Sequence, residues 1–277
     1  MLVWYFSPDT PTMPTLRTPD AQLFYEVAGS GPVLVLLHPF PLNHSFWTPV
    51  AQQLSSRYRL VLPDLRAHGD SEPGEGPVTM EKLAADLAAL CHEEKVTRAI
   101  FAGVSIGGYL LFEFWRRYRE RVAALVLANT RPTADTAEAR RDRLASADKV
   151  LREGTAGFIE ETLVKLFSPV TVSNRPDIVD AARRMMQKMS PQDIAAVQQG
   201  MAGRPDSIAT LNTIDVPTLI LTGEDDSVPR AEAELMRQMV PNSQLHVIAR
   251  AGHYAALEQP LEFARLLRSF CDQLPRD

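Results

Sequence analysis

The sequence has few cysteines, and no strong excess of either charge. Its two cysteines, Cys91 and Cys271, lie far apart in apolar patterns typical of helices. We therefore expect both to pack in the core instead of forming a disulfide or a metal site. So little cysteine use is typical of a reducing compartment, and the chain is predicted to be cytoplasmic, with no metal or other cofactor.

The charge balance excludes the strongly basic nucleic-acid-binding proteins. The formal net charge is −5, and the 29 basic residues are dispersed along the chain. The densest basic cluster, residues 116–121, ends a predicted helix, where the helix dipole favours cations. We therefore expect neither nucleic acid nor a membrane as a partner.

The first residues lack the features of an export signal. The opening MLVWYF is apolar, but it is too short for a signal-peptide core and has no basic leader. The prolines between residues 7 and 14 then break any helix. We expect residues 1–13 to form an extension that precedes the folded domain.

Apolar runs of buried-strand type alternate with helical patterns along most of the chain. A chain of 277 residues with 45% hydrophobic residues can bury a large core. Strands are predicted at 23–27, 33–37, 60–62, 99–103, 124–128, 218–222 and 244–248, and helices at 46–54, 80–93, 109–119, 231–239 and 261–274. This alternation predicts an α/β fold with a doubly wound, mostly parallel sheet.

The alternation stops between residues 132 and 207. This stretch is rich in Ala, Arg, Met and Gln, has helical periodicity, and contains no convincing β-branched run. It predicts a helical cap inserted into a core formed by residues 14–131 and 208–277.

The clearest chemical motif is Gly103-Val104-Ser105-Ile106-Gly107-Gly108, which follows a predicted strand and leads into a helix. A small-x-Ser-x-small pattern at such a junction forms a tight turn that holds the serine hydroxyl out at the end of the sheet. Ser105 is therefore the predicted nucleophile.

A serine nucleophile needs a base, and the base needs a carboxylate. His253 is the best candidate base, because it follows the last predicted strand in a loop at the carboxyl edge of the sheet. Three carboxylates, Glu224, Asp225 and Asp226, follow the strand at 218–222 and compete for the acid position.

The order Ser, Asp, His and the strand-turn-helix serine resemble the α/β-hydrolase superfamily from about residue 23 to the C-terminus. The resemblance favours Asp226 as the acid, with Asp225 as the alternative. His38-Pro39-Phe40 is similar to the family's oxyanion loop, which implies that the N–H groups of Phe40 and Ile106 form the oxyanion hole. Asp64 to Ser71 resembles a family loop in which the Asp and Arg are mainly structural.

Among capped serine hydrolases, the chain looks most like 3-oxoadipate enol-lactonases and small carboxylesterases. This likeness implies hydrolysis of a carboxylic ester or lactone through an acyl-enzyme on Ser105. Two alternatives stay open: a cofactor-free haloperoxidase or perhydrolase, and a receptor on the same fold with little or no catalysis.

The substrate pocket is expected beneath the cap. Apolar residues that could line it are Trp47, Phe158, Phe167, Met185, Met189 and Tyr254. The alternative for each of them is packing within the core of the cap or of the sheet.

Overall fold

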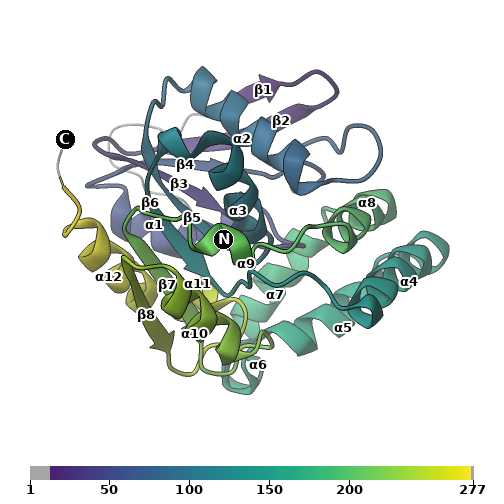
Figure 1. Ribbon diagram of the computed structural model, residues 1–277. Helices are drawn as coiled ribbons and strands as arrows, with labels where there is room; N and C mark the ends of the chain where they lie inside the picture. Colours follow the sequence, from purple (N-terminus) through teal and green to yellow (C-terminus); the bar gives the residue numbers. More distant parts are fainter. Residues whose placement is uncertain (1–12, 276–277) are drawn as a thin grey trace.

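The computed structural model describes residues 13–275, and in this range an eight-stranded sheet carries helices on both faces (Figure 1). The strand order is β1-β2-β4-β3-β5-β6-β7-β8. Only the β1–β2 and β2–β4 pairs are antiparallel. The predicted doubly wound, mostly parallel sheet is confirmed. The strands are β1 (Thr15–Arg17), β2 (Gln22–Ala28), β3 (Val33–Leu37), β4 (Arg59–Pro63), β5 (Ala99–Val104), β6 (Val122–Ala128), β7 (Thr218–Gly223) and β8 (Ser243–Ile248).

Helices cover both faces of the sheet because successive side chains of each buried strand point to opposite sides. In β3, Leu34 and Leu36 pack on one face with α1 and α12, while Val35 and Leu37 pack on the other with α2 and α3. The helices of the core are α1 (Thr48–Leu54), α2 (Met80–Glu93), α3 (Ile106–Tyr118), α9 (Ile208–Leu211), α10 (Arg230–Met239), α11 (Ala255–Glu258) and α12 (Pro260–Cys271), with 3₁₀ turns η1 (His44–Trp47) and η2 (Arg119–Arg121).

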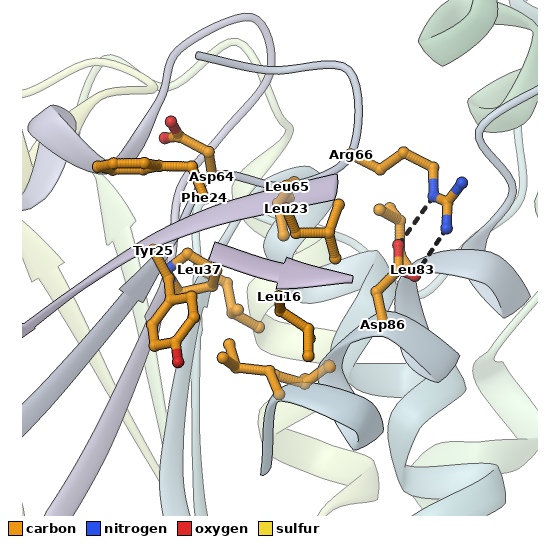
Figure 2. Close-up of a pocket in the computed structure, with 13 residues that line it drawn as sticks. Leu16, Leu23, Phe24, Tyr25, Leu37, Asp64, Leu65, Arg66, Leu83 and Asp86 are labelled. Atoms are coloured by element: carbon orange, nitrogen blue, oxygen red, sulfur yellow. Dashed lines mark hydrogen bonds and ion pairs between the residues drawn. The ribbon is translucent and has the colours of Figure 1, made fainter. Parts of the chain in front are cut away.

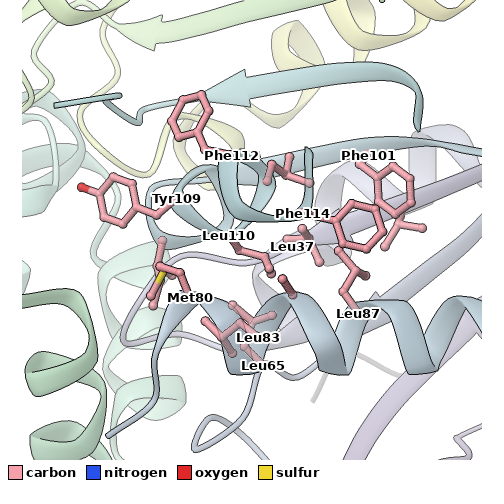
Figure 3. Packing of buried hydrophobic residues seen from close by; sticks show 14 of the residues in the cluster. Leu37, Leu65, Met80, Leu83, Leu87, Phe101, Tyr109, Leu110, Phe112 and Phe114 are labelled. Carbon is pink, nitrogen blue, oxygen red and sulfur yellow. The ribbon is translucent and has the colours of Figure 1, made fainter. Parts of the chain in front are cut away.

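Figure 3 shows the core on the α2 and α3 side of the sheet. Phe101 of β5 meets Phe114 of α3 with ring centroids 5.0 Å apart. Leu110 of α3 lies between Leu37 and the leucines of α2. Fully burying one such side chain contributes about 1.5–3 kcal/mol, so this packing fixes α3, the helix that follows Ser105, against the sheet.

Between β6 and α9 the chain forms five helices and no strand. They are α4 (Ala137–Glu153), α5 (Ala156–Leu166), α6 (Pro169–Asn174), α7 (Pro176–Met186) and α8 (Pro191–Ala202). We call residues 137–202 the helical segment. Helix α4 packs along α8, and the helical segment lies to one side of the sheet (Figure 1).

Polar side chains cap the starts of three helices of the helical segment, α4, α6 and α8. The hydroxyl of Thr136 accepts a hydrogen bond from the N–H of Ala139 at 3.1 Å. Ser190 and Asp193 form a reciprocal capping box at the start of α8. Such caps satisfy backbone N–H groups that have no partner within the helix.

The two cysteines are confirmed as buried and unpaired. Cys91 packs on the α2 side of the sheet and Cys271 on the α12 side, so the sheet separates them. No helix within residues 13–275 is long and apolar enough to cross a membrane. The same residues hold no cluster of His, Cys, Asp or Glu suited to a metal ion. The predicted N-terminal extension lies outside the described residues, except for Met13.

Candidate active site

A cavity of about 360 Å³ lies between the carboxyl edge of the sheet and the helical segment. Its volume falls in the usual range for small-molecule sites, roughly 300–1,000 Å³. Strand β3 has β4 as its neighbour on one side and β5 on the other, so the direction in which successive strands are added reverses at β3. Ligands of open α/β sheets bind at such a switch point. The lining residues are Phe40, Ser105, Tyr109, Arg131, Arg143, Ser146, Phe158, Glu161, Thr162, Lys165, Leu166, Gln198, Met201, Ser227, Val228 and His253.

Ser105 sits on a strained turn between β5 and α3, with φ 54° and ψ −112°. A non-glycine residue rarely adopts this conformation, which costs about 1–3 kcal/mol. The turn is tight because a Cβ on Gly103 would lie 2.4 Å from the carbonyl carbon of Gly107, and one on Gly107 would lie 2.7 Å from the carbonyl oxygen of Leu37. The glycines of the motif therefore permit the close approach that presents Ser105 to the cavity.

His253 and Asp226 form a buried hydrogen-bonded pair. Nδ1 of His253 lies 2.8 Å from Oδ1 of Asp226, and their side chains are 6% and 2% exposed. With Nδ1 engaged, Nε2 has no hydrogen-bond partner among the described residues and is free to act as a proton acceptor. His253 and Ser105 line the same cavity. The structure thus joins Asp226 to His253 and brings His253 to the cavity that Ser105 lines.

The environment of Asp226 favours its charged form. Burial alone would raise the pKa of this carboxyl, but the charge and hydrogen bond of His253, the N–H of Val228 and the amide of Asn129 lower it overall. Asn129 Nδ2 donates to Oδ2 of Asp226 at 2.7 Å. Asn129 therefore supports the acid from the end of β6, a contact that the sequence did not reveal.

The other two carboxylates of the loop point elsewhere. Asp225 accepts a hydrogen bond from the hydroxyl of Ser168 at 2.6 Å, and Glu224 accepts one from the N–H of Arg250 at 3.0 Å. Among the described residues, neither of these carboxylates forms a hydrogen bond or ion pair with His253. The geometry therefore favours Asp226 over Asp225.

The two expected oxyanion donors are Phe40, which lines the same cavity as Ser105, and Ile106, which follows Ser105 in the chain. Phe40 lines the cavity from the loop after β3, and Ile106 is the first residue of α3. Within residues 13–275, neither N–H donates to a protein acceptor. Backbone N–H groups left unpaired beside a serine suit an oxyanion.

Only one of the six expected pocket residues, Phe158, lines the cavity. The structure places Trp47, Phe167, Met185, Met189 and Tyr254 in the hydrophobic core instead, each less than 10% exposed. This corrects the expected lining. The physical reason is mutual packing: Trp47 stacks edge-on against Phe263, and Tyr254 against Phe167.

The loops that carry Asp226 and His253 are tied to the helical segment. The buried carboxylate of Glu258 accepts hydrogen bonds from the N–H of Gly252 and from the N–H of Ser168, both at 2.9 Å, and from the hydroxyl of Thr171 at 2.7 Å. The N–H of His253 donates to the carbonyl of Leu166 at 2.8 Å. The start of α6 and the end of α5 therefore help to hold His253 in position.

The remaining loop histidines are part of the scaffold. Nε2 of His38 accepts a hydrogen bond from the N–H of Leu65 at 2.9 Å. Burial, together with the charge of the neighbouring His68, lowers the pKa of His38 to about 3. Nδ1 of His44 lies 2.7 Å from Oδ1 of the buried Asp64. Neither His38 nor His44 lines the cavity.

Figure 2 shows a second hollow, beneath β1 and β2. Its volume is about 20 Å³, room for roughly one water. At one side Arg66 pairs with Asp86 through two hydrogen bonds of 2.9 and 2.7 Å. This hollow is a gap in the core and not a ligand site, and Arg66 has a structural role there.

Comparisons with known proteins agree with this fold. The sequence profile of the α/β-hydrolase family matches residues 34–266. The solved structure of a thermophilic esterase from Thermogutta terrifontis, with malate bound, is 36% identical. It has a TM-score of 0.90 and covers 96% of this chain and 99% of its own.

Relatives known from sequence carry several names. A Bacillus subtilis protein tentatively assigned as a 2-succinyl-6-hydroxy-2,4-cyclohexadiene-1-carboxylate synthase is 29% identical over 258 residues, covering 89% of this chain and 94% of its own. 3-oxoadipate enol-lactonase 2 of Acinetobacter baylyi is 26% identical over 252 residues, covering 90% and 92%. Together with the profile match and the geometry of the site, these likenesses establish that the chain belongs to the α/β-hydrolase family.

Proposed function

We propose that this protein is a serine hydrolase that cleaves a small carboxylic ester or lactone. Relatives named esterase and enol-lactonase support an ester-cleaving hydrolase. The observation that carries the proposal is the buried Asp226–His253 pair, which opens onto the cavity lined by Ser105. A carboxylate, an imidazole and a serine hydroxyl on a strained turn are the parts of a nucleophilic triad.

In the proposed reaction, the Ser105 oxygen attacks the carbonyl carbon while Nε2 of His253 takes the hydroxyl proton. Asp226 holds the ring through Nδ1–H and stabilises the imidazolium that forms. The bond to the alcohol then breaks, and His253 returns the proton to the leaving oxygen. Water, deprotonated by His253, attacks the acyl-enzyme and releases the carboxylic acid and Ser105.

Phe40 and Ile106 supply the oxyanion hole in this scheme. Their N–H groups donate to the carbonyl oxygen as it gains negative charge. Removing one such donor typically lowers kcat roughly 10²–10³-fold. Pro39 has no N–H and cannot contribute.

The helical segment acts as the cap. Phe158 and Leu166 of α5 and Met201 of α8 give the cavity apolar walls, which suit the hydrocarbon part of a small ester. In this proposal the cap is an insertion of residues 132–207 that contains the helical segment, and residues 14–131 and 208–277 form the core.

Hydrolysis of p-nitrophenyl butyrate by the purified protein tests the proposal. We expect steady turnover that falls at least about 10³-fold in Ser105→Ala and His253→Ala. The control is Ser269→Ala, which changes an exposed serine of α12 and should keep full activity. Covalent labelling without turnover would favour the receptor alternative, and full activity in Ser105→Ala would refute the proposal.

A further inference from the structure

Three arginines converge on one buried carboxylate beside the cavity. The side chain of Asp135 is 2% exposed, and Arg131, Arg143 and Arg204 approach its oxygens at 2.6, 2.5 and 2.7 Å. Burial opposes the charge of Asp135, but the hydrogen bonds and charges of Arg143 and Arg204 lower its pKa overall. One negative charge therefore faces three positive ones, and two positive charges are left unbalanced.

Arg204 is held by other protein groups. Its guanidinium lies 4.2 Å from the ring centroid of Tyr109 and donates to the carbonyl of Thr133 at 2.7 Å. It does not line the cavity. The excess charge is therefore presented by the other two arginines.

Arg131 and Arg143 line the same cavity as Ser105. Nε of Arg131 is buried and has no hydrogen-bond partner among the described residues. Arg143 donates to Oε1 of the buried Gln198 at 3.1 Å, which holds the guanidinium in place. An unpaired buried N–H costs about 1–3 kcal/mol, which an anionic ligand near Arg131 would offset.

The rest of the lining does not neutralise this charge. Lys165 adds a third cation. Glu161 is the one acidic residue of the lining; it is 55% exposed and pairs with Lys149 at 2.9 Å. The field inside the cavity is therefore positive near Arg131 and Arg143.

We propose that the substrate carries a carboxylate, which Arg131 and Arg143 bind while its ester or lactone carbonyl lies at Ser105. This inference rests on the proposed hydrolase function. Guanidinium groups match a carboxylate through paired N–H donors, and such charge-assisted bonds are about twice as strong as neutral ones. The two arginines thus determine substrate specificity and orient the ester toward the nucleophile.

The test compares matched esters. One series consists of mono-p-nitrophenyl esters of α,ω-dicarboxylic acids with four to eight carbons. In the second series an isopropyl group replaces the free carboxylate. We expect kcat/KM to favour the anionic ester at one or more chain lengths. Arg131→Gln and Arg143→Gln should each lower the anionic-to-neutral ratio of kcat/KM by about tenfold or more.

Arg141→Gln is the matched control, because it removes the same charge from the exposed face of α4 outside the cavity lining. It should leave the ratio unchanged. A measurement that needs no variant is inhibition of neutral-ester hydrolysis by pentanoate against pentanamide, and the carboxylate should inhibit more strongly.

Each outcome decides one claim. No preference for anionic esters at any length, or an equal fall of the ratio in Arg141→Gln, would overturn the carboxylate site. If neutral esters are still hydrolysed through Ser105, the hydrolase proposal survives that result. If Ser105→Ala hydrolyses both series as well as the wild type, the hydrolase proposal itself fails.

Discussion

Replacing Asp226 by Asn tests how the site uses its buried charge. Oδ1 of Asp226 lies 2.8 Å from Nδ1 of His253 and 3.0 Å from the N–H of Val228, while Oδ2 accepts from Asn129 at 2.7 Å. Both oxygens therefore face donors. An amide has only one acceptor oxygen, so its NH₂ group must face a donor in either orientation.

The two orientations damage the site in different ways. With the NH₂ group toward His253, Nδ1 must become an acceptor, which puts the ring proton on Nε2, where it faces the substrate side and blocks base catalysis. With the NH₂ group toward Asn129, two donors meet at 2.7 Å and the charge that stabilises the imidazolium is lost. We expect kcat/KM to fall roughly 10³–10⁴-fold, or about 4–5.5 kcal/mol.

The assay is steady-state hydrolysis of p-nitrophenyl butyrate at pH 7.5, with Asp225→Asn as the control. Asp225 is exposed, and an amide at this position still offers Ser168 an acceptor oxygen. The control should lose less than about threefold, as expected for a surface change. Equal losses in the two variants, or a larger loss in Asp225→Asn, would refute the assignment of the acid.

Three further predictions concern stability. Gly107→Ala should destabilise the protein by more than about 2 kcal/mol in urea unfolding, because its Cβ would lie 2.7 Å from the backbone of Leu37. The control Gly157→Ala, in the open first turn of α5, should be neutral or slightly stabilising. Similar effects of the two substitutions would contradict the packing argument. Glu258→Gln should cost about 1–3 kcal/mol, since one amide oxygen cannot accept from Gly252, Ser168 and Thr171 together; an unchanged urea midpoint would refute this. The pKa of Asp226 is lowered in the folded protein, so its charge stabilises the fold above the ordinary carboxyl pKa of about 3.9, and this stabilisation is lost as the pH falls through the folded pKa. The difference in unfolding free energy between wild type and Asp226→Asn should therefore be larger at pH 7 than at pH 3. Equal differences at the two pH values would count against the buried charge.

The strands were predictable because they are continuous apolar runs bounded by turns. The run at 33–37 became β3 with the same bounds, and the helix at 80–93 became α2. Strand β1 was missed because it has three residues and buries only Leu16. Its stability comes from pairing with β2, which is a tertiary contact that local sequence does not encode.

Site residues were predictable where a backbone constraint marks them. Ser105 lies among glycines that the turn requires, and His253 follows the last strand of the sheet. The pocket was not predictable from apolar periodicity, because Met185 and Phe158 belong to similar amphipathic helices and only tertiary packing decides which side chain faces the cavity. The cluster at Asp135 depends on arginines from three separate segments, so no local sequence pattern predicts it.

The most direct test of the account is to find where a covalent inhibitor attaches. A p-nitrophenyl phosphonate should add once to the protein, and peptide mass spectrometry should place the adduct on Ser105. The adduct should be absent in Ser105→Ala and form far more slowly in Asp226→Asn. An adduct on another residue, or ester turnover that continues in the fully labelled protein, would contradict the claim that Ser105 is the nucleophile.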